Sequence, residues 1–171
     1  MKINKNLNSV NSIFLISLIL NLVNYKIYQN TIIRWEIISF FYLFGGFIFF
    51  IFINKLKKIS TWNNITNFVF CIAVIGSFLT FSVLGMNFFF SNKLMIKENY
   101  KIQEKKQAIG PKYNRNKKSP IAIIEIKNSY QKEIKFELDQ TENLKKANFV
   151  ELDLSEGLFN FPIIRNKKLK N

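Results

Sequence analysis

The sequence predicts a membrane α-helical fold, with three transmembrane helices followed by a small C-terminal antiparallel β domain. Hydrophobic residues gather in the first half, where 15 of the 19 Phe residues precede residue 91. Charges gather in the second half, since residues 1–90 carry seven Lys or Arg and one acid, whereas residues 91–171 carry 18 basic and ten acidic residues. After residue 90, apolar and polar residues begin to alternate, which is the pattern of half-buried strands.

The first span is expected at about residues 10–28. Two lysines precede its apolar core, Asn21 and Asn24 interrupt it, and Lys26 closes it. A cleaved signal peptide would begin in the same way, but Asn, Tyr, Lys and Ile follow the core instead of a small-residue cleavage site. A retained first span is therefore favoured.

The second and third spans are expected at residues 35–53 and 67–90. The second begins at Trp35 and ends at a cluster of lysines, as a span does where it meets the charged interface. The third contains 19 consecutive uncharged residues, Phe68–Met86, which as a helix cover about 30 Å, the thickness of the hydrocarbon core. A soluble core of three such helices is not expected, because the charged remainder of the chain is too small to cover them.

Lysine and arginine in the short loops favour a cytoplasmic N-terminus and an extracytoplasmic C-terminal domain, in a multi-pass protein of the cell membrane. In this orientation the cytoplasmic side holds Lys2, Lys5, Lys55, Lys57 and Lys58, and the outer short loop holds Lys26 and Arg34. The basic residues that follow the third span, from Lys93 to Lys105, favour the opposite orientation. The preference is therefore modest.

Polar and small residues within the spans have two interpretations each. Arg34 and Glu36 flank the start of the second span and are interpreted as boundary residues, so a proton relay is not expected. The small residues of the third span allow close helix contact, either in a dimer or, preferably, within the chain (Ala73, Gly76, Ser77 and Thr80). Gly45-Gly46 is interpreted in the same way, or as a weak point of its helix.

Behind the spans we expect a basic connector at residues 93–119 and a small β domain at residues 120–171, with an added strand possible at 99–105. The connector reads as a strand end followed by an exposed basic loop, 105–118. The predicted strands are 120–127, 132–138, 149–154 and 158–165, with a helical or looped crossover at 139–147. The inward positions are Ile134, Phe136 and Leu138 on one strand and Val150, Leu152 and Leu154 on another. Pro162 places the last strand at an edge.

The strand, turn and strand of this region and its late turn at Gly157, Leu158 and Phe159 resemble those of uncharacterised small bacterial multi-pass membrane proteins with a C-terminal β domain. The resemblance covers about the last 75 residues and implies no activity. A bacterial source also fits the abundance of Lys, Asn, Ile and Phe, which AT-rich codons favour.

The residues needed for most catalytic chemistry are missing from the sequence. There is no His, one Cys (Cys71) and no Gly-rich phosphate motif, so His-dependent triads, thiolate metal clusters and nucleotide loops are excluded. The acids of the β domain alternate with apolar residues as a solvated strand face does. We therefore expect no enzyme and no catalytic, cofactor or metal site.

The sequence favours a membrane-anchored interaction or accessory protein that presents its β domain. Its expected partners are the lipid bilayer, a protein at the β domain and anionic lipid at the basic connector, whereas nucleic acid is not expected. The alternative is a small oligomeric channel or transport subunit. That alternative requires a polar path lined by Asn21, Asn24, Asn67 and Asn87.

Overall fold

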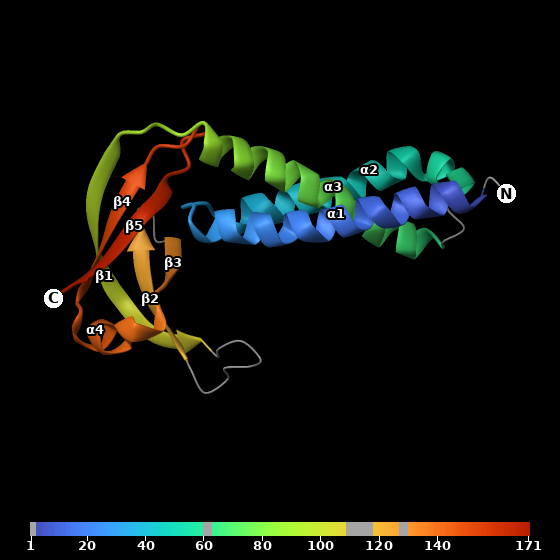
Figure 1. Cartoon of the computed structure of the whole chain (residues 1–171). Coiled ribbons are helices and arrows are strands. Elements are labelled where there is room, and N and C mark those ends of the chain that lie inside the picture. Colours follow the sequence, from blue (N-terminus) through green and yellow to red (C-terminus); the bar gives the residue numbers. More distant parts are fainter. Residues whose placement is uncertain (1–2, 60–62, 109–117, 127–129) are drawn as a thin grey trace. The chain divides into compact units, whose positions relative to one another are not determined.

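The computed structural model describes residues 3–59, 63–108, 118–126 and 130–171, and it divides into two compact units, Met1–Ser91 and Asn92–Asn171. The first unit contains α1 (Ile3–Gln29), α2 (Trp35–Ile59) and α3 (Asn64–Phe89) (Figure 1). Each holds a stretch long and apolar enough to cross a membrane: Asn11–Gln29, Trp35–Lys55 and Asn64–Phe89. The three predicted apolar helices are confirmed.

The third helix begins three residues before the predicted start, because a polar cap fixes its first turn. The Asn63 side chain accepts a hydrogen bond of 2.8 Å from the Thr66 backbone N–H. This bond satisfies one of the amide groups that a helix leaves unpaired at its N-terminus. The boundary follows the capping side chain and not the first run of apolar residues.

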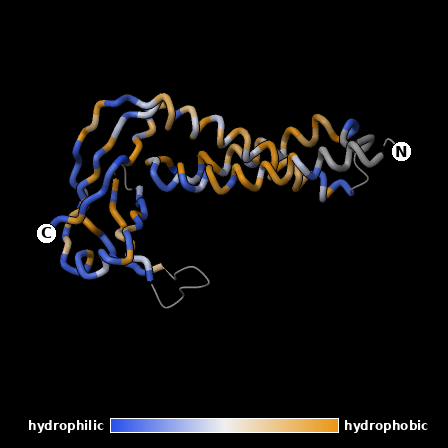
Figure 2. Tube along the Cα trace, in the orientation of Figure 1, coloured by the Kyte–Doolittle hydropathy of each residue, from blue (hydrophilic) through white to orange (hydrophobic). Residues whose placement is uncertain are grey.

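The helical unit has apolar residues on its outside and polar residues on its inside. α3 packs against both α1 and α2, while large apolar side chains such as Leu22, Leu43 and Phe50 are 63–70% exposed. Figure 2 shows the apolar residues along all three helices. The buried polar side chains come mainly from α1 and α3 and include Ser17, Asn24, Asn67, Ser77, Thr80 and Asn87. This distribution is the reverse of that expected for a helix bundle surrounded by water.

Glycines allow α2 and α3 to approach closely. A Cβ atom built on Gly76 would lie 2.5 Å from Tyr42 Cδ1 and 2.9 Å from Tyr42 Cα, and one built on Gly45 would lie 2.9 Å from the Gly76 nitrogen. Real Cβ atoms do not come so near other heavy atoms. Gly76 therefore serves a contact within this chain, and Gly45 belongs to the same contact.

The second unit is a five-stranded antiparallel sheet with the strand order β3-β2-β1-β4-β5. Its strands are β1 (Met95–Ala108), β2 (Ser119–Ile126), β3 (Tyr130–Lys135), β4 (Phe149–Ser155) and β5 (Ile163–Lys170). The short helices η2 (Leu138–Gln140) and α4 (Thr141–Lys146) form the crossover from β3 to β4. The antiparallel sheet and the helical crossover are confirmed.

Much of the stretch expected as a basic connector, 93–119, belongs to the sheet. The first half of β1 pairs with β4 and its second half pairs with β2, with a register shift between Ile102 and Glu104. β1 is therefore the central strand, and Figure 1 shows it long and curved. Residues 99–105, where an added strand was possible, lie within β1. Of the expected basic loop, residues 109–117 lie outside the described part of the chain.

The predicted inward residues are buried except one. Ile134 and Phe136, and Val150, Leu152 and Leu154, are at most 6% exposed, but Leu138 is 41% exposed. The prediction for Leu138 was wrong because β3 ends at Lys135 and Leu138 opens η2. In β2 neighbouring residues are buried on both faces, since the crossover also packs on this strand.

The last strand starts later than predicted, at Ile163 instead of 158. The residues before it form a turn, in which the Asn160 N–H donates to the Gly157 carbonyl oxygen at 2.9 Å. Asn160 has a φ of 60°, a conformation that Asn tolerates better than most residues. β5 is an edge strand, as Pro162 predicted, and it continues to Lys170.

Candidate functional site

The helical unit holds a cavity between its three helices, and two polar contacts lie beside it. Asn24 Nδ2 donates to the Ser77 carbonyl oxygen at 2.9 Å, and the Tyr42 hydroxyl donates to Asn21 Oδ1. Beside these two bonds lies a cavity of about 240 Å³, lined by Asn21, Asn24, Tyr25, Tyr28, Ile38, Tyr42, Thr80 and Leu84. Asn21 and Asn24 fall on the same side of α1 because their spacing is close to one helical turn.

Two buried oxygen atoms of the lining residues have no hydrogen-bond partner, Asn24 Oδ1 and Thr80 Oγ1. The two side chains are only 4% and 1% exposed. The bond to Ser77 fixes the Asn24 amide, so the oxygen is the atom left over. Buried polar groups without partners are rare in folded proteins and need an explanation. Both atoms are closed off from the cavity as well, since almost none of their surface is accessible.

The four asparagines expected to line a channel are not brought together. Asn21 and Asn24 line the cavity, but Asn67 and Asn87 are not among its lining residues. Both are buried elsewhere on α3, where they are at most 2% exposed. Residues 67 and 87 stand near opposite ends of that helix, about 30 Å apart along its axis. Two of the four asparagines therefore line one cavity, and the other two are buried at separate positions on α3.

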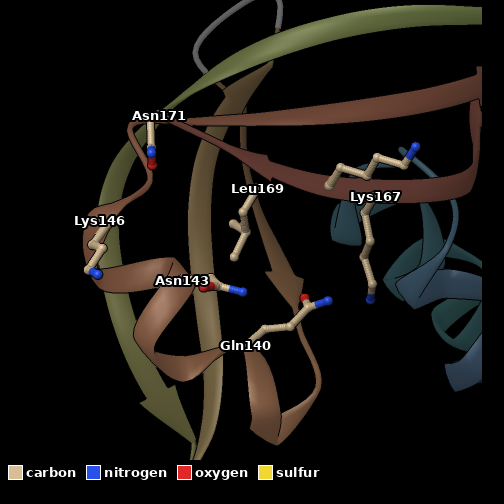
Figure 3. A pocket seen from close by; sticks show the side chains of 7 residues that line it. Gln140, Asn143, Lys146, Lys167, Leu169 and Asn171 are labelled. Atoms are coloured by element: carbon tan, nitrogen blue, oxygen red, sulfur yellow. The ribbon is translucent and has the colours of Figure 1, made fainter.

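The second unit holds a basic pocket, defined by Gln140, Asn143, Lys146, Lys167, Lys168, Leu169 and Asn171, with a volume of about 420 Å³. Its walls are the crossover η2–α4 and the end of β5. Figure 3 shows Gln140 and Asn143 reaching toward the space that Leu169 and Lys167 border. Three lysines and several side-chain amides supply hydrogen-bond donors, and no carboxylate side chain lines the pocket. This combination suits an anionic group.

The pocket lies beside β5, an edge strand of the sheet. Lys167, Lys168 and Leu169 are consecutive residues of β5 and all line it, although successive side chains of a strand point to opposite faces. Since β5 is an edge strand, the pocket lies at the side of the sheet. Within the described sheet β5 pairs with β4 alone, so its other edge is the side available for pairing.

Lys167 joins the two edge strands. Its ammonium group donates to the Lys135 carbonyl oxygen and stands 5.5 Å from the centroid of the Phe136 ring. Burial lowers the pKa of Lys167, and the neighbouring charge of Glu137 acts in the opposite direction. Lys167 is thereby held in place, whereas Lys146 and Lys168 are exposed.

A buried lysine, Lys132, lies on β3. The alternation in the sequence placed Lys132 at the start of the predicted strand but did not predict its burial. Lys132 is 4% exposed and lies on the same face as Ile134 and Phe136. Burial lowers the pKa of its amine to about 8, and the adjacent Glu133 charge partly offsets this. Lys132 is not among the residues that line either cavity, so we treat it as a determinant of stability.

Neither the cavity nor the basic pocket was predicted from sequence as a site. Part of a signal was present, because Asn21, Asn24 and Tyr28 recur at helical spacing in an otherwise apolar segment. The sequence contains no comparable signal for the basic pocket, because its lining combines residues of the crossover with residues more than twenty positions later. In the part of the chain that the structure describes, no group of three or more His, Cys, Asp or Glu residues could hold a metal ion.

Comparison of this chain with protein-family models, with curated proteins and with solved structures finds no match.

Proposed function

We propose that this chain is a membrane-anchored interaction protein, which crosses the cell membrane three times and presents its C-terminal sheet to a partner protein. The observation that carries the proposal is the reversed polarity of the helical unit. Side chains such as Leu22, Leu43 and Phe50 stand outward at 63–70% exposure, while Asn24 and Thr80 are buried. Each exposed apolar residue would be costly in water and is stable in a bilayer.

The proposed orientation has the N-terminus in the cytoplasm and the C-terminal domain outside it. Only Arg34 and Lys26 stand at the short loop between α1 and α2. More basic residues stand on the other side, near the N-terminus and in the last turns of α2. Basic residues in short loops remain on the cytoplasmic side. Trp35, which is 61% exposed at the start of α2, suits the headgroup region.

The basic pocket supports binding of an acidic, extended segment of a partner protein. The edge of β5 can accept a further strand through its backbone, and the lysines of the pocket can pair with carboxylates of that strand. The second unit has a net charge of +8, which speeds the approach of an acidic partner. Lysines also discourage two sheet edges from pairing indiscriminately, so the charge selects an acidic strand over a neutral one.

The test measures binding of a fluorescent peptide, in which Glu alternates with Val, to the full chain in nanodiscs of uncharged lipid. We expect the double variant Lys146→Glu, Lys168→Glu to bind at least about tenfold more weakly, since two charge-assisted contacts are lost. The matched control is Lys101→Glu, an exposed lysine of β1 outside the pocket. Equal loss in the control and in the double variant would refute a role for the pocket.

A further inference from the structure

We propose that one end of the sheet inserts apolar side chains into the surface of the bilayer that the helices cross. The inference rests on the membrane insertion proposed above and does not depend on the partner of the basic pocket. Its starting point is a set of large apolar side chains that are 43–74% exposed, which we name the apolar end of the sheet: Leu94, Met95, Ile96, Leu158 and Phe159.

The register of the strands brings these side chains to the same end. Met95 opens β1 and pairs with Ser155, the last residue of β4, which also pairs with Ile163, the first residue of β5. The turn from β4 to β5 therefore lies beside the start of β1, where the Asn92 N–H donates to the Glu156 carbonyl oxygen at 2.8 Å. Two of the five side chains belong to this turn, Leu158 and Phe159.

The start of β1 leaves apolar surface on both faces of the sheet. Neighbouring residues of a strand point to opposite faces, yet Met95 and Ile96 are 62% and 64% exposed. Single exposed apolar residues need no explanation, but a group of them marks a surface that meets a protein or a membrane. The apolar end is such a group.

The covalent connection to α3 favours the bilayer as the surface that the apolar end meets. α3 ends at Phe89 and β1 begins at Met95, and six fully extended residues reach about 20 Å at most. In a membrane-spanning α3, the last turn lies near the headgroup region. The start of β1 therefore stays within reach of the bilayer surface, which has a far higher effective concentration than a diffusing partner.

The composition of the apolar end suits this surface. Lys93 and Lys97 are exposed and flank the apolar residues of β1. Lysine stems can lie along apolar surface while their ammonium groups reach headgroup phosphates. Residues 92–97 and 156–162 together carry these two lysines and one acid, Glu156. Aliphatic and aromatic side chains bordered by lysines are typical of segments that lie in the membrane interface.

Insertion of the apolar end would hold the basic pocket away from the bilayer. β5 runs from Ile163 at the apolar end to Lys170, which pairs with Phe149 at the opposite end of β4. The pocket is lined by Lys167 and the residues after it, and four or more residues of strand cover at least about 13 Å. The pocket thus remains open to a partner in the water.

The test measures how deep single fluorophores lie in the bilayer. The full chain with Leu158→Cys in a Cys71→Ser background is labelled with an environment-sensitive dye and placed in phosphatidylcholine nanodiscs. Some nanodiscs contain a lipid spin-labelled near the top of its acyl chain. We expect this lipid to quench the dye by about half or more, since interfacial apolar side chains lie roughly 5–10 Å deep, and iodide in the water to quench it weakly.

The matched control is Lys106→Cys in the same background, an exposed position eleven residues beyond Met95 on β1. Its dye should be quenched by iodide and not by the lipid. Equal quenching by iodide at residues 106 and 158 would overturn the proposal. Protection of residue 158 from iodide without quenching by the lipid would also overturn it, because protein would then cover the apolar end.

A third label at Leu43→Cys, an exposed position of α2, separates this proposal from membrane insertion. Lipid quenching at residue 43 and not at residue 158 would refute only the insertion of the apolar end. Absence of lipid quenching at both positions would refute membrane insertion itself.

The double variant Leu94→Ser, Ile96→Ser removes two exposed side chains of the apolar end and touches no buried position. We expect lipid quenching of the dye at residue 158 to fall by at least about half, because the apolar surface that favours insertion is lost. Phe149→Ser, which changes a 40% exposed residue at the opposite end of β4, should leave the quenching unchanged. Equal quenching in the double variant and the wild type would contradict the proposal.

Discussion

Lys132 provides the sharpest test of the sheet's interior. The side chain is 4% exposed on β3, and its burial lowers the pKa from 10.5 to about 8. A tenfold change in protonation corresponds to about 1.4 kcal/mol, so the charged amine costs the folded domain ~3 kcal/mol at neutral pH. We expect Lys132→Met, which keeps a long unbranched side chain, to raise the free energy of unfolding by up to that amount near pH 7.

The pH dependence has a defined sign. Between about pH 8 and pH 10.5 the folded protein releases the Lys132 proton while the unfolded chain retains it. The unfolded state then binds more protons, so the stability of the wild-type domain rises with pH. The advantage of Lys132→Met should shrink across this window and vanish above it.

Urea unfolding of the full chain in detergent, followed by far-UV circular dichroism of the sheet, measures both proteins at several pH values. The comparison cancels the other titrating groups, which the two proteins share. Parallel pH profiles for wild type and Lys132→Met would refute the argument, as would a variant less stable than wild type near pH 7.

Three further predictions concern packing and capping. Gly76→Ala should destabilise the helical unit by about 1–3 kcal/mol in thermal unfolding, because the α2 backbone must shift. Gly85→Ala, where the nearest atoms would lie 3.7 Å away, should be neutral or stabilising, and similar losses in both would contradict the close contact. Asn63→Ala should cost about 1 kcal/mol and speed hydrogen exchange in the first turn of α3, and unchanged exchange would argue against the cap. Leu152→Ala, at a fully buried position, should cost about 2–5 kcal/mol in urea unfolding, against ~0.5 kcal/mol or less for the exposed Leu158→Ala, and equal costs would place the core elsewhere.

The three helices could be predicted because length and uninterrupted apolar character are local properties of the chain. The strands with regular alternation, such as Phe149–Ser155, could be predicted for the same reason. β1 was assigned mostly to a connector because most of its residues are polar or charged and exposed. Its strand structure depends on pairing with β4 and β2, residues far away in the sequence.

The candidate sites depend even more on tertiary contacts. Asn24 and Thr80 meet only because α1 packs against α3, and nothing in the local sequence of either helix specifies the partner. Lys146 and Lys168 likewise meet because the crossover leads into β4, which pairs with β5. Composition revealed the excess of lysine, but the pocket that gathers these lysines is a property of the fold.

The proposed function requires that the helices insert in the membrane and that the sheet domain lies outside the cytoplasm. The most direct measurement places a single thiol on the sheet by Lys101→Cys in a Cys71→Ser background, since Lys101 is exposed on β1 and Cys71 is buried. Intact spheroplasts are then treated with a membrane-impermeant maleimide. We predict labelling before lysis. Labelling only after lysis would contradict the proposed orientation and place the basic pocket in the cytoplasm.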